Sequence, residues 1–165
     1  MVSYWVLRQN YAEITNQSQI MSLILTKKIV TCPWGGWGLA KENVIRGYYN
    51  ETTSDKSGRT SSGQDRKFVE DIMVGDIILI PFTGIKGCIV ARITSLPQEI
   101  NTGLYWKEND GHINISKHEG TPFMPIGRYL EIIDTGFIPV KRTGQLTLSK
   151  MNKDIIDQIR VRYHL

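Results

Sequence analysis

The sequence has little of the chemistry that cross-links small proteins or binds structural metals. Its 165 residues include only two cysteines, Cys32 and Cys88, and three histidines. Two cysteines are too few for a disulfide framework, and the scattered histidines show no metal-ligand spacing. We therefore expect neither a disulfide-stabilised secreted fold nor a structural zinc site.

Long apolar runs are also lacking. No segment approaches the roughly 18 consecutive apolar residues that would predict a membrane span. Met1 leads straight into a strand-like pattern, without the charged leader of a targeting segment. These absences favour a cytoplasmic protein.

Catalytic signatures are absent too. Neither a glycine-rich phosphate-binding motif at the start of a helix nor a nucleophile elbow is present. Acidic residues such as Asp65, Glu70 and Glu108 have no paired spacing that commits them to acid–base chemistry or to a nuclease metal site. Asp76, directly after Gly75, is typical of a turn residue. We therefore expect no enzymatic activity from this chain alone, no cofactor and no bound metal.

What the sequence does contain is an ordinary globular composition, with 41% hydrophobic and 22% charged residues. This length and composition predict one domain, spanning residues 1–165. The stretch Asn50 to Gln64 (NETTSDKSGRTSSGQ) has no aliphatic residue, so we expect a mobile loop at about residues 50–65. Two interpretations of this loop stay open: a tolerated insertion, or a basic loop that closes on a bound polyanion.

Basic residues outnumber acidic ones, which gives a formal net charge of +4 and a pI near 9.1. This balance favours an anionic partner only mildly. Each basic group taken alone is typical of a solvated surface, but several groups on one face would favour phosphate binding. The candidates for contact with a nucleic-acid backbone are Lys27, Lys28, Arg59, Arg66 and Lys67.

Helical and strand patterns both occur along the chain, which predicts an α+β fold. The strongest signal is the apolar run Ile77–Phe82, typical of a buried strand, with Gly87–Thr94 as its hairpin partner across a turn at Thr83–Lys86. Trp5 lies in a strand pattern and is expected in the core. The other expected elements are strands at Tyr4–Arg8, His112–Ser116, Tyr129–Ile133 and Phe137–Val140, a helix at Ala12–Ile29, a short helix or a turn and strand at Lys41–Tyr49, and a final helix at Lys150–Arg162.

The stretch Val30 to Ala40, VTCPWGGWGLA, places two indoles, Trp34 and Trp37, among residues that disfavour regular structure. Two interpretations stay open: the indoles anchor the loop by packing, or they contact a ligand. Trp106, with Tyr105 beside it, lies in the polar stretch 101–111, where a ligand contact is favoured over a core role.

Three segments together resemble the PUA-like superfamily, in particular its EVE and YTH branches. They are Tyr4–Arg8, Val69–Ile80 with Met73-Val74-Gly75-Asp76 inside it, and Gly87–Ile93. The order and spacing of these segments carry the resemblance, which extends from Tyr4 to about Trp106. The Trp37-Gly38 pair is also similar to the specificity domains attached to some prokaryotic modification-dependent restriction enzymes. The resemblance implies a small, bent β-barrel with flanking helices.

Members of the YTH branch and many EVE domains are thought to hold a modified nucleobase in an aromatic cage. The resemblance places Trp34 or Trp37 at one wall of such a cage and Trp106, with Tyr105, at another. A base stacked on an aromatic ring gains about 1–3 kcal/mol, and the nearby glycines allow the backbone to approach it closely. The further candidates for contacts with the base are Gln9, Asn10, Cys32 through its backbone, Phe82, Asn109 and Asp110.

The sequence therefore predicts a non-catalytic reader of modified nucleic acid, which flips a methylated or otherwise altered base into the cage. The similarity to restriction-linked domains favours DNA and implies a nuclease or NTPase partner, as a subunit or a fused domain. Two other functions stay open: an RNA-binding PUA-like module, and a protein-interaction module anchored by the tryptophan loop.

Overall fold

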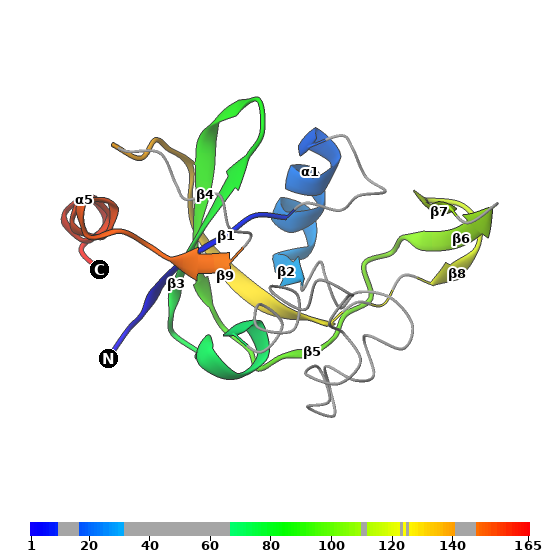
Figure 1. Ribbon diagram of the computed structural model, residues 1–165, viewed down its shortest axis with the longest axis horizontal. Helices are drawn as coiled ribbons and strands as arrows, with labels where there is room; N and C mark the ends of the chain where they lie inside the picture. Colours follow the sequence, from blue (N-terminus) through cyan, green and yellow to red (C-terminus); the bar gives the residue numbers. More distant parts are fainter. Residues whose placement is uncertain (10–16, 32–66, 110–111, 123, 125, 141–147) are drawn as a thin grey trace, which may run out of the picture.

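A computed structural model of the chain describes residues 1–9, 17–31, 67–109, 112–122, 124, 126–140 and 148–165 (Figure 1). For Trp106, Glu108, Asn109 and His112–Ile115 it describes the backbone alone. The expected elements at 41–49 and the expected loop at 50–65 lie outside the described residues. The described elements are β1 (Tyr4–Leu7), α1 (Gln17–Lys27), β2 (Ile29–Thr31), the π-helix η1 (Lys67–Asp71), β3 (Ile77–Phe82), β4 (Ile85–Ile93), β5 (Gln98–Glu99), β6 (Tyr105–Asn109), β7 (His112–Ser116), β8 (Thr121–Pro122), β9 (Ile126–Phe137), β10 (Leu148–Lys150) and α5 (Lys153–Tyr163).

The main sheet curls into a half-barrel (Figure 1). Its strand order is β10-β1-β3-β4-β9-β2, and β5 pairs with the start of β9. Neighbouring strands are antiparallel except β1 and β3, which run parallel. The 12-residue strand β9 carries the curl, because its first residues pair with β2 and β5 whereas its later residues pair with β4.

The long strand β9 corrects one prediction, because the separate strands expected at Tyr129–Ile133 and Phe137–Val140 are wrong. One strand runs through to Phe137 and stays paired with β4, and the pairing register shifts at β-bulges on either side of Val90. At the start of β9, a Cβ atom on Gly127 would lie 2.5 Å from the backbone oxygen of Val30. Close approach of β2 therefore requires glycine at this position.

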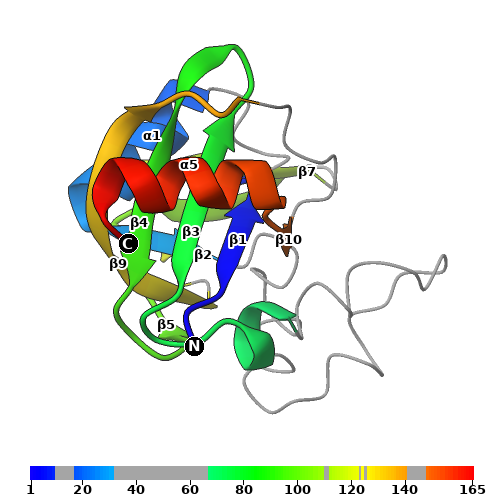
Figure 2. The ribbon, with the colours of Figure 1, turned by 90° about the vertical axis from the view of Figure 1, so that its left-hand side faces the viewer.

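Helices cover both faces of the sheet. α1 lies within the curl, and α5 crosses the outer face over β1, β3 and β4 (Figure 2). Along β3 the side chains alternate: Ile78 and Ile80 belong to the inner core with α1, whereas Ile77 and Leu79 belong to the outer core with α5. All of Ile77–Phe82 is buried, which confirms the predicted strand. The run is continuously apolar because both of its faces are covered.

Helix α1 ends earlier than the sequence predicts. Lys28 adopts a left-handed conformation with φ 55°, and its N–H donates to the Ile24 carbonyl at 2.7 Å, as at a helix C-terminus. Ile29 then begins β2, so the helix expected to reach Ile29 is wrong at that end. The β-branched residues Ile29 to Thr31 favour a strand, and all three are buried beside β9. The expected first residues of the helix, 12–16, lie outside the described part.

The β3–β4 hairpin and α5 confirm two further predictions with shifted ends. The hairpin turn is shorter than expected, because Ile85 already pairs with Phe82 and Gly84 supplies the positive φ of 77°. α5 begins after Lys150, because that residue still belongs to β10. Asn152 then caps the helix, accepting the Ile155 N–H on its side chain at 3.1 Å.

Asp76 and Trp5 tie the start of the chain to the turn before β3. Trp5 is 2% exposed, which confirms its predicted core position, and its indole N–H donates to Asp76 Oδ2 at 2.9 Å. The same carboxylate accepts the backbone N–H groups of Ser3 and Met73, also at 2.9 Å. The predicted turn role of Asp76 is confirmed, and the contact with Trp5 extends it.

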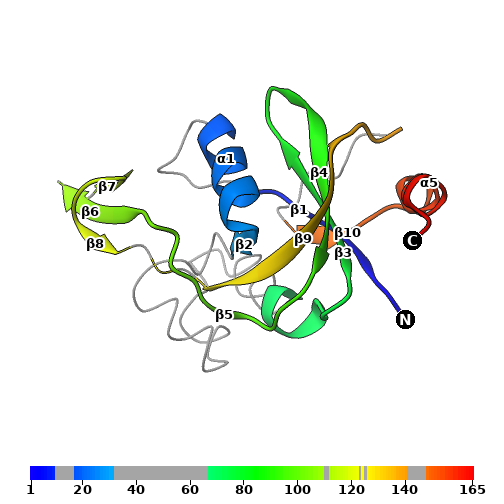
Figure 3. The same ribbon diagram turned by 180° about the vertical axis from the view of Figure 1, so that it is seen from behind.

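A second sheet, with strand order β7-β6-β8, forms an arm on the far side of α1 from the main sheet (Figures 1 and 3). We define the arm as these three strands and the turns between them. β7 confirms the strand expected at His112–Ser116. Trp106 pairs with Ile115 on β7 and with Thr121 on β8, so it lies on the central strand of the arm.

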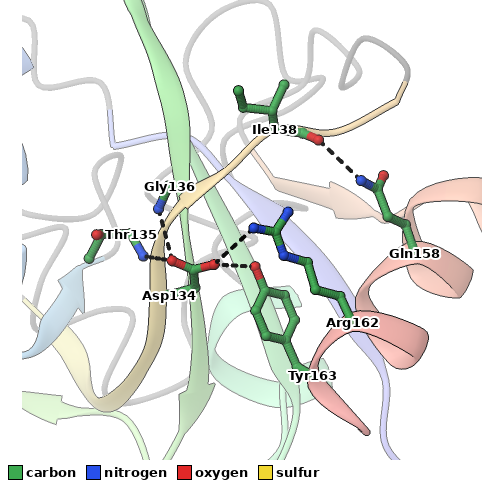
Figure 4. Close-up of polar contacts among 7 residues, drawn as sticks. All are labelled: Asp134, Thr135, Gly136, Ile138, Gln158, Arg162 and Tyr163. Atoms are coloured by element: carbon green, nitrogen blue, oxygen red, sulfur yellow. Dashed lines mark hydrogen bonds and ion pairs between the residues drawn. The ribbon is translucent and has the colours of Figure 1, made fainter.

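Helix α5 is fastened to β9 through a carboxylate (Figure 4). Asp134 accepts a hydrogen bond from the Tyr163 hydroxyl and further bonds from the N–H groups of Thr135 and Gly136, at 2.7 and 3.1 Å. The hydrogen bond from Tyr163 is the main reason that the pKa of Asp134 lies below its ordinary value. Burial, together with the Asp134 carboxylate, raises the pKa of Tyr163 to about 12.

The described residues thus form a mixed α+β fold, a strongly curled half-barrel with helices on both faces, consistent with the predicted small bent barrel. Among these residues, no helix has the length and apolar character needed to cross a membrane.

Candidate functional site

A groove of about 670 Å³ lies between α1 and the arm. These two elements stand side by side in opposite views (Figures 1 and 3). The volume falls in the range of ligand sites, about 300 to 1,000 Å³. The groove is lined by Ser18, Gln19, Ser22, Leu23, Thr26, Lys27, Thr102, Gly103, Leu104, Ser116, Lys117 and His118.

One wall of the groove is the polar face of α1. Its residues recur at intervals of four and make two adjacent ridges: Ser18, Ser22 and Thr26 form one, and Gln19, Leu23 and Lys27 form the other. Ile20 and Ile24, on the opposite side of the helix, are buried in the inner core. At 1.5 Å per residue each ridge is about 12 Å long. The helix therefore presents hydroxyl, amide and ammonium groups along the whole wall.

The other wall consists of the chain that enters the arm, at residues 102–104, and of the end of β7 with the turn after it, at residues 116–118. Gly103 turns with φ 74°, and its N–H donates to Asn101 Oδ1 at 2.9 Å. Lys27 crosses toward this turn, because its Nζ lies 3.6 Å from the position that a Cβ atom on Gly103 would occupy. After β7, the Ser116 hydroxyl donates to the Glu119 carbonyl at 3.0 Å and so shapes the turn that carries Lys117. Both walls of the groove thus bring a lysine to it.

Among the described residues, the charge of the lining has one sign. Lys27 and Lys117 are exposed, and none of the described lining residues is a carboxylate. The neighbouring acidic residue of the arm, Glu119, lies 3.6 Å from Lys107 Nζ and so pairs outside the groove. The arrangement can accept anionic groups and neutral hydrogen-bonding groups. No cluster of three His, Cys, Asp or Glu side chains able to hold a metal occurs in the described part of the chain.

Gln9, predicted to contact a base, is instead engaged within the protein. It is 2% exposed, its amide N–H donates to the Thr31 carbonyl at 2.9 Å, and its oxygen accepts the Thr31 N–H at 3.0 Å. These paired bonds resemble a one-residue strand ladder at the end of β2. Gln9 thereby holds the point from which the chain enters the tryptophan stretch.

The predicted aromatic pair of the polar stretch lies on β6. Tyr105 and Trp106 are its first residues, and Tyr105 is half-buried and pairs with Ser116. Leu104, directly before them, lines the groove. β6 therefore starts at the edge of the groove. Asn109, another predicted contact, ends the same strand.

The remaining predicted residues fall in three places. Phe82 is 5% exposed and belongs to the inner core. Lys28 is exposed just past the end of α1, and Lys67 begins η1. The predicted residues outside the described part are Asn10, Cys32, Trp34, Trp37, Arg59, Arg66 and Asp110.

A buried arginine that the sequence did not single out holds η1 in place. Arg128, on β9, is 1% exposed, and its guanidinium donates to the Val69 carbonyl at 3.0 Å and to the Ser95 carbonyl at 3.4 Å. It also lies over the Phe68 ring, 5.8 Å from the centroid. Burial lowers the pKa of Arg128 to about 10, with the charge of Asp76 opposing this. Its contacts indicate an anchoring role.

Sequence reasoning also missed most of the groove. Of its basic residues, Lys27 was predicted, whereas Lys117 was not, and His118 was not predicted either. The spacing of Ser18, Ser22 and Thr26 was a usable signal, because small polar residues at every fourth position form one face of a helix.

No protein-family model matches the chain, and no curated protein matches its sequence. A solved structure of a hypothetical protein from Leishmania major aligns over 99% of this chain and 96% of its own, with 14% sequence identity and a TM-score of 0.44. A TM-score and a sequence identity this low assign neither a fold family nor a function.

Proposed function

We propose that the protein binds nucleic acid without catalysis and holds one modified base, flipped out of its strand, in an aromatic cage. The observation that carries the proposal is the groove between α1 and the arm, whose described lining combines hydroxyl and amide groups with Lys27, Lys117 and His118, with no carboxylate among these residues. Such a lining suits phosphate and sugar oxygens, which receive most protein hydrogen bonds in nucleic-acid complexes.

The proposed cage combines Trp106 with Trp34 or Trp37, as the resemblance to EVE and YTH domains implies. Two features support it. β6 begins at the edge of the groove, so a strand whose phosphate backbone lies in the groove could place its next base beside Trp106. Thr31, held by Gln9, is the last residue of β2 before the tryptophan stretch. We extend the proposal to the PUA-like type of barrel, which the curled sheet around α1 supports.

We propose DNA as the nucleic acid and a restriction or defence context, on the resemblance to restriction-linked specificity domains. In that context the protein supplies recognition, and cleavage belongs to a nuclease or NTPase subunit or to a fused domain. The proposed role itself requires no cofactor and no metal.

The proposal is tested with a panel of oligonucleotides, single- and double-stranded, DNA and RNA, each with or without one altered base. Binding is read by indole fluorescence and by the anisotropy of a labelled strand. We expect a preference for one modified base, and Trp106→Ala should reduce that affinity by about tenfold, because a lost base stack removes roughly 1–3 kcal/mol. Tyr129→Ala, which removes an aromatic ring 42% exposed on β9, is the matched control and should change nothing.

Other outcomes of the panel would overturn the proposal in different ways. Equal binding of RNA with and without modification would indicate an RNA-binding module. The absence of salt-dependent binding to every oligonucleotide would indicate a protein-interaction module. A preference for a modified base that survives Trp106→Ala would remove Trp106 from the cage.

A further inference from the structure

The polar face of α1 is a wall of a groove and not a protruding element. Proteins that read duplex DNA through the major groove insert an exposed helix or β-ribbon into a groove about 12 Å wide. Here the arm stands opposite the helix face that carries Ser18, Ser22 and Lys27, and residues of both walls line one recess. This face of α1 therefore cannot enter a duplex, whereas a thin ligand can enter the recess.

We propose that the groove takes a single unpaired strand, with Lys27 and Lys117 on opposite walls as its phosphate contacts. The inference rests on the proposed function and adds the strandedness of the substrate: nucleic acid that is single-stranded, or unpaired beside the base that is read.

The groups along the walls match the chemistry of such a strand. Ser22 and Thr26 can each donate to a phosphate oxygen or accept from a sugar hydroxyl, and the Gln19 carboxamide can do both. Leu23 and Leu104 supply apolar contact for a sugar or base face. The lining residues that the structure describes include no acidic group to repel the phosphates, and neither Lys27 nor Lys117 forms an ion pair with a described carboxylate.

The number of lysines predicts a measurable salt dependence. For single strands, the slope of log affinity against log salt concentration is about −0.7 for each phosphate neutralised. Removing one lysine contact should reduce the slope by about 0.7, and removing both should reduce it by about 1.4. This reduction is specific to phosphate contacts, because a variant that only perturbs folding would not change the slope by a fixed increment.

The experiment measures the anisotropy of a labelled oligothymidylate of about 16 nucleotides, the upper end of single-strand site sizes. The competitors are the unlabelled strand and the same strand annealed to its complement, between about 50 and 200 mM NaCl. The variants are Lys27→Gln, Lys117→Gln and the double variant. Lys153→Gln is the control, because it removes the same charge from the exposed start of α5, on the outer face of the sheet.

We expect the single strand to compete better than the duplex. Each groove variant should weaken binding by about fivefold, and the control should match wild type. Ser22→Tyr, which narrows the groove at an exposed position without changing charge, should also weaken the single strand, by about tenfold or more. Circular dichroism verifies that each variant is folded.

Two results would overturn the inference and leave the proposed function standing: a duplex that competes as well as the single strand, or single-strand binding with an unchanged salt slope in the double variant. Failure of every modified and unmodified oligonucleotide to bind would instead overturn the proposed function, and this inference with it.

Discussion

Replacing Asp76 by alanine removes the acceptor that ties the first strand to the turn before β3. Its carboxylate accepts the Trp5 indole N–H and the backbone N–H groups of Ser3 and Met73, each at 2.9 Å. The indole is buried, so losing its charged acceptor costs about 2 kcal/mol. Ser3 and Met73 are closer to the surface, where water replaces the carboxylate, and each contributes about 1 kcal/mol. The free energy of unfolding should fall by about 4 kcal/mol in total.

Urea denaturation followed by circular dichroism measures this loss. For a chain of this size, 1 kcal/mol corresponds to about 2–4 °C, so the melting temperature should fall by about 8–16 °C. Trp5→Phe removes the indole N–H together with part of the buried ring, and in that background Asp76→Ala should cost about 2 kcal/mol less, because the hydrogen bond is already gone. Asp157→Ala, on the exposed face of α5, is the matched control and should stay within about 0.5 kcal/mol of wild type. A loss below about 1 kcal/mol for Asp76→Ala, or additive effects of the two variants, would refute the reasoning.

Two further predictions concern β9. Gly127→Ala should lower the free energy of unfolding, measured in urea, by about 2–4 kcal/mol, because its Cβ atom would lie 2.5 Å from the Val30 oxygen. Gly136→Ala is the control, because no atom lies within 4 Å of the added Cβ. Equal urea midpoints for the two variants would contradict the close approach of β2 to Gly127. Tyr163→Phe removes the hydrogen bond that lowers the pKa of Asp134, so the variant should be less stable than wild type at neutral pH. That difference is fully present above the unfolded-state pKa of about 3.9 and is lost as pH falls through the lower folded-state pKa. A difference in free energy of unfolding that persists unchanged in acid would exclude this linkage.

Strands with their own strong pattern could be predicted from the sequence, whereas strands defined by their partners could not. Ile77–Phe82 was predictable because a short run of six buried residues needs no knowledge of neighbours. β2, β5, β8 and β10 are two or three residues long and exist only because β9, β6 and β1 lie beside them. Local preference carries too little information at that length.

The single strand β9 was missed for a specific reason. Asp134, Thr135 and Gly136 have the composition of a turn, and Asp134 does accept the two following N–H groups, as in an Asx turn. Yet Val90 on β4 stays paired with Asp134, and Cys88 with Phe137. Cross-strand pairing therefore overrides a local turn signal, and a bulge accommodates both.

In the candidate site too, residues with a local signal could be predicted, whereas residues that packing brings together could not. Lys27 was predicted as one of two adjacent basic residues, Lys27 and Lys28, which are visible in the sequence. Lys117 could not be connected with it, since the two lysines are brought to one groove by the packing of the arm against α1. Gln9 has the side chain of a base reader, and only the position of Thr31 shows that its carboxamide is already in use.

The position of β1 between β3 and β10 has a consequence for synthesis on the ribosome. Tyr4 pairs with Ile77, and Trp5 pairs with Lys150, so β1 has one partner from the middle of the sequence and one from its far end. Such distant pairings slow folding and leave an apolar segment unpaired while translation proceeds. One edge of β1 therefore stays open to pairing with other chains, as a transient aggregation hazard, until β10 has been made.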